Sequence, residues 1–361
     1  MGALASIVDP RIEQPAEAMG HLPSYDAYKA FIEGLEIFWR GGYLESVHHF
    51  ERAIELDPDY QMPRILSAFA YGNAGERAQS ARLLQELESS RADLSPYEAY
   101  RLDQLQSGQR GDLEGARRAA LQAAAISPEF GPVVDAASLA GHLNRPREAI
   151  AAFLTIDTTR VLLGWTLYWE ELTGARHVLG EHSEELEDAR RGRARNPDSL
   201  QVLFCEARAL AALGNIVEVQ ELLAGAVNLQ PEGLWSPGGV LRTVSLELKI
   251  HGYPEAAKEV IVRAVDWYES LPAAQKHALR FNLAETYHTE GAPIGHVVGV
   301  FAEQAFEDLP GFAHAVGDEE RLIQSALEAR RPTSAQVCEL GRLLELEVSE
   351  TQRHDQVDHY R

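Results

Sequence analysis

The sequence predicts an all-α protein in which pairs of short helices follow one another as repeats of similar length. Three observations support this prediction. Apolar residues recur at helical spacing, glycine-containing turns interrupt them at a near-constant interval, and prolines close several of the intervals. No segment has the sustained alternation of apolar and polar residues that is typical of a half-buried strand.

The prototype repeat spans residues 27–60. Its first half places Phe31 and Phe38 at helical spacing before Gly41, where a backbone without a Cβ atom can reverse direction. A second apolar stripe follows the turn, and Pro58 closes the repeat because proline cannot donate the helical hydrogen bond. The segment is therefore expected to form helix, turn, helix and stop.

Six later turns mark the same place in later repeats. With the first, they are Gly41, Gly75, Gly111, Asn144, Gly180, Gly214 and Gly252. By subtraction, successive turns lie 34, 36, 33, 36, 34 and 38 residues apart. The closing prolines Pro58, Pro128, Pro197 and Pro231 are spaced by 70, 69 and 34 residues, which is the same period or twice it. Two independent markers therefore indicate one repeat of about 34 residues.

The prototype resembles the tetratricopeptide repeat (TPR). The positions that carry the resemblance are Gly34, Ile37, Ser46, Phe50, Ala53 and Pro58. Ala30 and Glu33 stand where the family has tryptophan and leucine, so the repetition carries more weight than any single copy. The resemblance implies a TPR-type α-solenoid, a right-handed superhelix of helix-turn-helix repeats.

The remaining elements follow in order. Ser24 is expected to cap the first helix, and Ser95-Pro96 is expected to start the fifth. The later repeats are expected at residues 61–93, 97–130, 131–157, 166–199, 200–233 and 237–271, with an eighth beginning at 281. A short insertion separates the fourth repeat from the fifth. Three large rings follow it, Trp165, Tyr168 and Trp169, and helical spacing favours core packing over a ligand site.

This pattern predicts three regions. Residues 1–23 contain three prolines without periodicity and are expected to be a linker or loosely docked arm. Residues 24–291 are expected to form one solenoid of about seven to eight repeats. Residues 292–361 lose the repeat spacing and end in a polar tail; they could be an atypical helical cap, a divergent extension or a shifted reading frame.

Composition excludes several function classes. With 55 acidic against 33 basic residues the formal charge is −22, a field that repels nucleic acid. The arginines between Arg190 and Arg195 fan around a helix and are expected to form a solvated face. Cys205 and Cys338 form no metal or disulfide motif, which is typical of a reducing compartment. No apolar run is long enough for a membrane span. We therefore expect a cytoplasmic protein.

No common catalytic motif is present, so we expect a non-enzymatic protein with no cofactor, metal or catalytic residue. The nearest approach to a metal cluster is His177, Glu181 and His182, which straddle the turn at Gly180; there, spacing does not fix their geometry. The competing hypothesis is an unrecognised hydrolase or transferase site in the groove near Trp169 and His177.

The TPR resemblance implies that protein or peptide partners bind on the concave face, at the second, fifth, ninth, twelfth and thirteenth places of each first helix. In the first repeat these places hold Tyr28, Phe31, Leu35, Phe38 and Trp39. Such a face would select an apolar segment with basic flanks. Packing of the same rings against the N-terminal arm is the alternative. The lysine and asparagine clamp of chaperone-binding TPR domains is absent, because Phe31 and Leu35 occupy its places.

A second resemblance extends from residue 3 to about residue 290. It is to the TPR region that follows the catalytic domain in some bacterial serine/threonine protein kinases and related multidomain regulators. It depends on the stretch ALASIVDPR and on the prototype repeat after it. None of the kinase motifs occurs, so the resemblance implies a detached sensory or docking region without the transferase.

Overall fold

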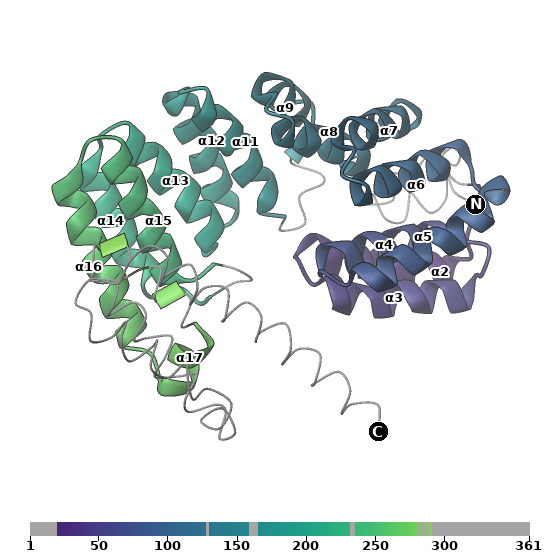
Figure 1. Ribbon diagram of the computed structural model, residues 1–361, viewed down its shortest axis with the longest axis horizontal. Helices are drawn as coiled ribbons and strands as arrows, with labels where there is room; N and C mark the ends of the chain where they lie inside the picture. The colour runs from purple at the N-terminus through teal and green to yellow at the C-terminus, as the bar shows by residue number, and fades with distance from the viewer. Residues whose placement is uncertain are drawn as a thin grey trace, which may run out of the picture. The chain divides into compact units, whose positions relative to one another are not determined.

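The computed structural model describes most of the chain between residues 20 and 290 (Figure 1). The described residues are 20–127, 130–158, 165–231 and 235–279, with 282, 283, 286, 289 and 290. Their regular structure is helical, and no β-strand occurs among them. The all-α prediction is confirmed. The chain divides into two compact parts, residues 1–213 and residues 214–361.

The first part contains five consecutive helix pairs, each with a first helix A and a second helix B. They are α2 (Tyr25–Trp39) with α3 (Tyr43–Leu56), α4 (Met62–Asn73) with α5 (Arg77–Ser89), α6 (Pro96–Gln109) with α7 (Leu113–Ile126), α8 (Phe130–His142) with α9 (Pro146–Phe153), and α11 (Leu167–Val178) with α12 (His182–Arg195). A 3-10 turn, η1 (Arg91–Asp93), precedes α6, and α13 (Leu200–Ala212) ends this part. Consecutive helices pack on each other, and several A helices touch the next A helix.

The seven turns predicted from the sequence are confirmed. The six turn glycines have φ between 72° and 90°, and Asn144 has φ of 58°. This left-handed region is accessible to glycine at no steric cost and, among other residues, is best tolerated by asparagine and aspartate. The residue types at the turns are therefore dictated by the backbone reversal between helix A and helix B.

Helix starts also follow the sequence. The Ser24 Oγ accepts a hydrogen bond of 3.4 Å from the Ala27 amide. Ser95 and Glu98 form a reciprocal capping box at α6, with bonds of 3.2 Å and 2.8 Å. Burial raises the pKa of the Glu98 carboxyl, although the amides of Ser95 and Gly20 oppose this by donating to it. Both predicted caps are confirmed.

Small residues let the paired helices approach closely. A Cβ atom on Gly34 of α2 would lie 2.8 Å from the Phe50 ring of α3. A Cβ atom on Gly192 of α12 would lie 2.8 Å from Trp169 of α11. Trp165, Tyr168 and Trp169 are all buried, which confirms that this aromatic cluster belongs to the core.

The second part contains α14 (Ile216–Ala226), α15 (Pro237–Ile250), α16 (Pro254–Glu269) and the short α17 (Ala273–Ala278). Helices α15 and α16 pack as a pair, and the Ser245 Oγ donates a 2.9 Å hydrogen bond to the Ala257 carbonyl. Gly238 permits this approach, because a Cβ there would lie 2.5 Å from the Tyr268 ring.

The ends of the predicted organisation lie largely outside the described residues. These are residues 1–19 of the predicted arm, the whole of the predicted cap or extension at 292–361, and much of the eighth repeat. The described end of the arm is docked, since His21 Nε2 lies 2.9 Å from Asp57 Oδ1. Burial alone would raise the pKa of Asp57, but hydrogen bonds from the Ser24 amide and His21 lower it overall.

Candidate functional site

The five residues predicted to bind a partner lie on α2, where three of them are buried. Phe31 is 1% exposed and its ring contacts Tyr60 at a centroid distance of 5.2 Å. Tyr28 and Phe38 are also buried, whereas Leu35 and Trp39 are partly exposed. The rings thus fill the core of the first repeats, and a binding role for this face stays a prediction.

Trp39 has a partner far away in the sequence. Its ring lies 5.4 Å from the ring of Trp165, at an interplanar angle of 68°. Trp165 follows the insertion after the fourth repeat and leads into α11. One side of the predicted face therefore packs against the fifth repeat, at a sequence separation that no repeat rule could reveal.

Polar side chains link the A helices further along the first part. Arg101 of α6 is buried and its Nη1 donates a 2.5 Å hydrogen bond to Asp135 of α8. Gln104 donates to the same carboxylate at 2.9 Å. On α11, burial raises the pKa of Glu171 to about 7, although a hydrogen bond with Ser138 of α8 opposes the rise.

The chain of contacts continues from α11 to α13. Gln201 of α13 donates a hydrogen bond to the Glu170 carboxylate of α11. Arg208 donates from Nη2 to the Thr173 hydroxyl at 3.0 Å. We refer to the side chains that make these contacts between A helices as the polar run: Arg101, Gln104, Asp135, Ser138, Glu170, Glu171, Thr173, Gln201 and Arg208.

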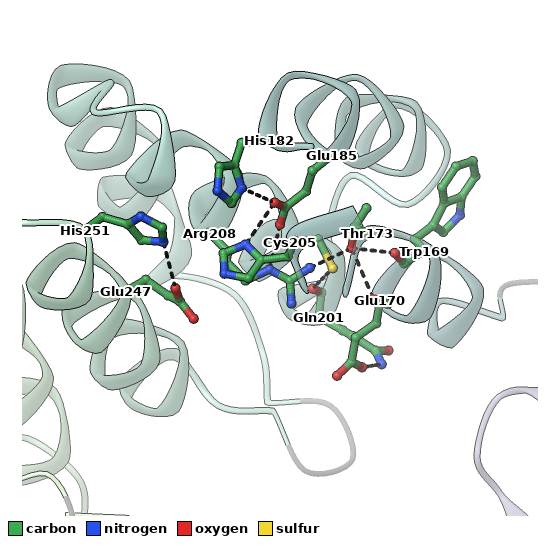
Figure 2. A network of polar contacts seen from close by, with 11 residues as sticks. Trp169, Glu170, Thr173, His182, Glu185, Gln201, Cys205, Arg208, Glu247 and His251 are labelled. Atoms are coloured by element: carbon green, nitrogen blue, oxygen red, sulfur yellow. Dashed lines mark hydrogen bonds and ion pairs between the residues drawn. The ribbon is translucent and has the colours of Figure 1, made fainter. Parts of the chain in front are cut away.

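Glu185 of α12 is a fully buried carboxylate with three partners (Figure 2). Arg208 Nε donates a 2.7 Å hydrogen bond to its Oε1. The Nδ1 atoms of His177 and His182 lie 2.9 Å and 3.1 Å from its Oε2. Burial alone would raise the pKa of Glu185, but the bond from His177 and the positive charge of Arg208 lower it overall. The carboxylate is therefore charged at neutral pH.

The sequence grouped the wrong carboxylate with the two histidines. Glu181 lies in the turn and pairs with Arg176 at 3.1 Å and Arg147 at 3.5 Å. Glu185 lies one helical turn beyond His182 and so shares its face of α12. The i, i+3 spacing of His182 and Glu185 is a local signal for their contact. The contact of His177 with Glu185 lies across the turn and has no such signal.

The places that the TPR resemblance implies for ligand contact can also be counted on α11 and α13. Counted back from the turn at Gly180, the fifth and twelfth places of α11 hold Glu170 and His177. Counted back from Gly214, the second and ninth places of α13 hold Gln201 and Arg208. The TPR resemblance thus implies ligand-facing places for these residues as well, and this stays a prediction.

The basic run on α12 is engaged with nearby acids and carbonyls. Arg191 lies 2.9 Å from Asp188, and Arg190 and Arg193 lie 3.3 Å and 3.4 Å from Glu206. Arg195 donates a 2.5 Å bond to the Thr158 carbonyl. Arg190 and Arg191 remain about half exposed, which agrees with the expected solvated face.

The thiol of Cys205 is poorly suited to nucleophilic chemistry. It is fully buried on α13, and burial raises its pKa to about 11. The group therefore stays protonated at neutral pH, whereas the thiolate is the reactive form of cysteine. Trp169 is also buried.

None of the described helices is long and apolar enough to cross a bilayer.

Comparisons with known proteins agree with the helix-pair architecture. No protein-family model matches the chain, and no curated protein matches it. A chain in the crystal structure of the APC/C hetero-tetramer Cut9-Hcn1 is similar, with a TM-score of 0.50 and 15% identity. The match covers 83% of this chain and 55% of that one, so this protein spans little more than half of its length.

Two TPR structures match with lower TM-scores. A tetratricopeptide repeat protein from Parabacteroides merdae has a TM-score of 0.39 and 12% identity, covering 73% of this chain and 99% of that one. The P58(IPK) TPR domain has a TM-score of 0.28 and 13% identity, covering 89% and 99%. The helix pairs and the first match confirm the predicted TPR-type α-solenoid. The resemblance to kinase-linked regions stays a prediction.

Proposed function

We propose that this chain is a non-enzymatic interaction scaffold that binds a peptide segment of a partner protein along its A helices. The observation that carries the proposal is the polar run, which links α6, α8, α11 and α13 of the first part. In arrays of this architecture the A helices form an extended concave binding surface.

The chemistry of the polar run suits a peptide backbone and its polar side chains. It offers carboxylate, amide, hydroxyl and guanidinium groups that are already held in position by each other, for example Gln201 on Glu170. Groups held in this way lose little conformational entropy when they bind a partner. Directed hydrogen bonds then give specificity, because a partner that leaves a buried polar group unpaired loses affinity.

Apolar contacts would come from the end of each A helix. The position two residues before the turn glycine is Trp39 in α2 and Val178 in α11. Val178 is 68% exposed, and Leu35 adds partly exposed apolar surface on α2. A segment with an apolar anchor and basic flanks fits this face, because the net charge of −22 steers basic groups toward it.

Site-specific photo-crosslinking tests the proposal. A photoreactive amino acid replaces Val178 on an A helix or, as the matched control, Leu121 on the B helix α7, which is 43% exposed. We expect a partner protein to be crosslinked from Val178 and not from Leu121. Crosslinks that form equally from both positions, or only from Leu121, would contradict the proposed surface.

A further inference from the structure

The corner between α11 and α12 brings three metal-ligating side chains together. His177 lies in the last turn of α11, His182 is the first residue of α12, and Glu185 follows one turn later. The left-handed Gly180, with φ of 72°, reverses the chain between the two histidines. Their ligand atoms and the Glu185 oxygen all lie within 4.8 Å of one another.

From this arrangement we infer that His177, His182 and Glu185 form a binding site for a divalent transition-metal ion of the Zn²⁺ type. The inference is independent of the proposed peptide surface. Two imidazoles and one carboxylate are a donor set that zinc uses in proteins with an open fourth position. That position would be taken by water or by a partner's side chain.

The distances suit one ion held by all three groups. Zinc bonds to imidazole and carboxylate are about 2.0 to 2.2 Å long, which places neighbouring ligand atoms about 3 to 3.5 Å apart. The two Nδ1 atoms lie 2.9 Å and 3.1 Å from Oε2 of Glu185. A small outward shift of the two imidazoles would therefore admit the ion, with each Nδ1 in its deprotonated tautomer.

Access and support are also present. The side chains of His177 and His182 are 21% and 20% exposed, whereas Glu185 is fully buried. Arg208 holds the other carboxylate oxygen, Oε1, at 2.7 Å, and so fixes the direction of Oε2. Outer-shell hydrogen bonds of this kind orient ligating carboxylates. The positive charge of Arg208 also weakens cation binding, so we expect micromolar rather than tighter affinity.

The nitrogen donors decide the class of ion. Imidazole suits zinc, cobalt, nickel and copper, whereas calcium and magnesium prefer oxygen ligands. The site should therefore discriminate strongly against magnesium. Cobalt is a suitable spectroscopic probe because, unlike zinc, it has visible absorption that reports coordination by nitrogen.

The test uses tag-free full-length chain, with Zn²⁺ titrated by calorimetry and Co²⁺ titrated by visible absorption. We expect saturable binding and a cobalt spectrum that indicates coordination by nitrogen. The variants His177→Gln and His182→Gln should each weaken binding at least tenfold, and the double variant should remove the cobalt spectrum. Mg²⁺ in excess should not compete.

The matched control is His48→Gln. His48 and Glu51 have the same i, i+3 spacing as His182 and Glu185, but His48 is 81% exposed and its Nδ1 lies 3.9 Å from the carboxylate. This variant should bind metal as the original chain does. Histidine variants are preferred to Glu185→Gln, because loss of that buried charge leaves Arg208 without its counterion.

Two results would overturn the inference, provided that circular dichroism shows each variant folded. The first is the absence of saturable Zn²⁺ or Co²⁺ binding to the original chain, in which case the three side chains form only hydrogen bonds. The second is unchanged affinity and cobalt spectrum in the double histidine variant, which would place the bound ion elsewhere.

Discussion

The A-helix face of α2 and the A-helix faces of α11 and α13 occupy equivalent places in their repeats but are built from different side chains. On α2 the places that the TPR resemblance predicts to face a ligand include Phe31 and Phe38, which are buried among other rings. On α11 and α13 they include charged and amide groups that bond between the two helices: Gln201 donates to Glu170. Arg208 donates to Thr173.

The difference shows that a place in a repeat does not fix the environment of its side chain. Rings on α2 can gain by packing on Phe50, Tyr60 and Trp165, so they withdraw from solvent. Carboxylates and guanidinium groups lose hydration when they are buried, so those of the polar run remain only where a partner compensates them. The aromatic side chains of α2 are therefore stabilised by burial, whereas the polar side chains of α11 and α13 are stabilised by their hydrogen bonds and ion pairs.

The largest expected effect comes from the aromatic face. Phe31→Ala should lower the free energy of unfolding by about 3 to 5 kcal/mol, because the ring is 1% exposed and its loss leaves a cavity. Leu35→Ala, at a partly exposed place on the same helix, should cost about 1 kcal/mol or less. Chemical denaturation of both variants measures this, and equal losses would show that the two places do not differ in burial.

The charged face should respond to the loss of one partner. Arg208→Met removes the counterion of the buried Glu185 and should cost about 3 kcal/mol of stability. The control Arg52→Met breaks an exposed pair with Glu55 and should cost about 0.5 kcal/mol or less. Denaturation midpoints at neutral pH compare the two, and a small effect of Arg208→Met would show that the two histidines alone stabilise the carboxylate.

Glu171 predicts a pH dependence. Its pKa is raised from 4.5 to about 7, so the unfolded chain ionises first as the pH rises. The folded state then holds more protons than the unfolded state, and stability falls between pH 4.5 and about 7. Glu171→Gln should remove this fall and be roughly 2 kcal/mol more stable at pH 8 after allowance for partial exposure.

Thermal unfolding of Glu171→Gln at pH 5 and pH 8 provides the measurement. The control Glu55→Gln alters an exposed glutamate and should change stability by less than about 0.5 kcal/mol at either pH. If Glu171→Gln follows the pH dependence of the original chain, the fall in stability comes from other groups.

Glycines inside helices should give effects of opposite sign, and the smaller of the two is among the smallest that we expect. Gly192→Ala should destabilise by about 1 to 3 kcal/mol, because its new Cβ would lie 2.8 Å from Trp169 and 2.9 Å from Val202. Gly108→Ala should stabilise by about 0.5 to 1 kcal/mol, since its Cβ meets nothing within 4 Å and alanine favours the helix. Thermal melts should therefore shift in opposite directions, and shifts of the same sign would contradict this account.

The repeat register could be predicted because its signals are local. A helix reversal needs a left-handed residue, and only glycine and a few polar residues supply it cheaply, so the turn at Gly180 and its equivalents were visible in the sequence. The caps at Ser24 and Ser95 were visible for the same reason, since each bonds to an amide three residues away.

The candidate sites depend on contacts that the sequence does not encode locally. Trp39 and Trp165 meet across three intervening repeats, and this contact depends on how each pair packs on the next. The polar run joins residues 31 to 35 positions apart, as between Glu170 and Gln201 or Thr173 and Arg208. Many pairings are possible at one repeat length, and side-chain burial selects among them.

The sequence by itself determined the all-α class, the period of the repeat, the turns and the helix starts, because each follows from backbone sterics or hydrogen bonds within a few residues. The tertiary structure alone decided that Phe31 belongs to the core and that Glu185, rather than Glu181, faces His177 and His182. Burial and charge pairing arise only when one helix is placed against another, so neither can be assigned from a residue's place in its own repeat.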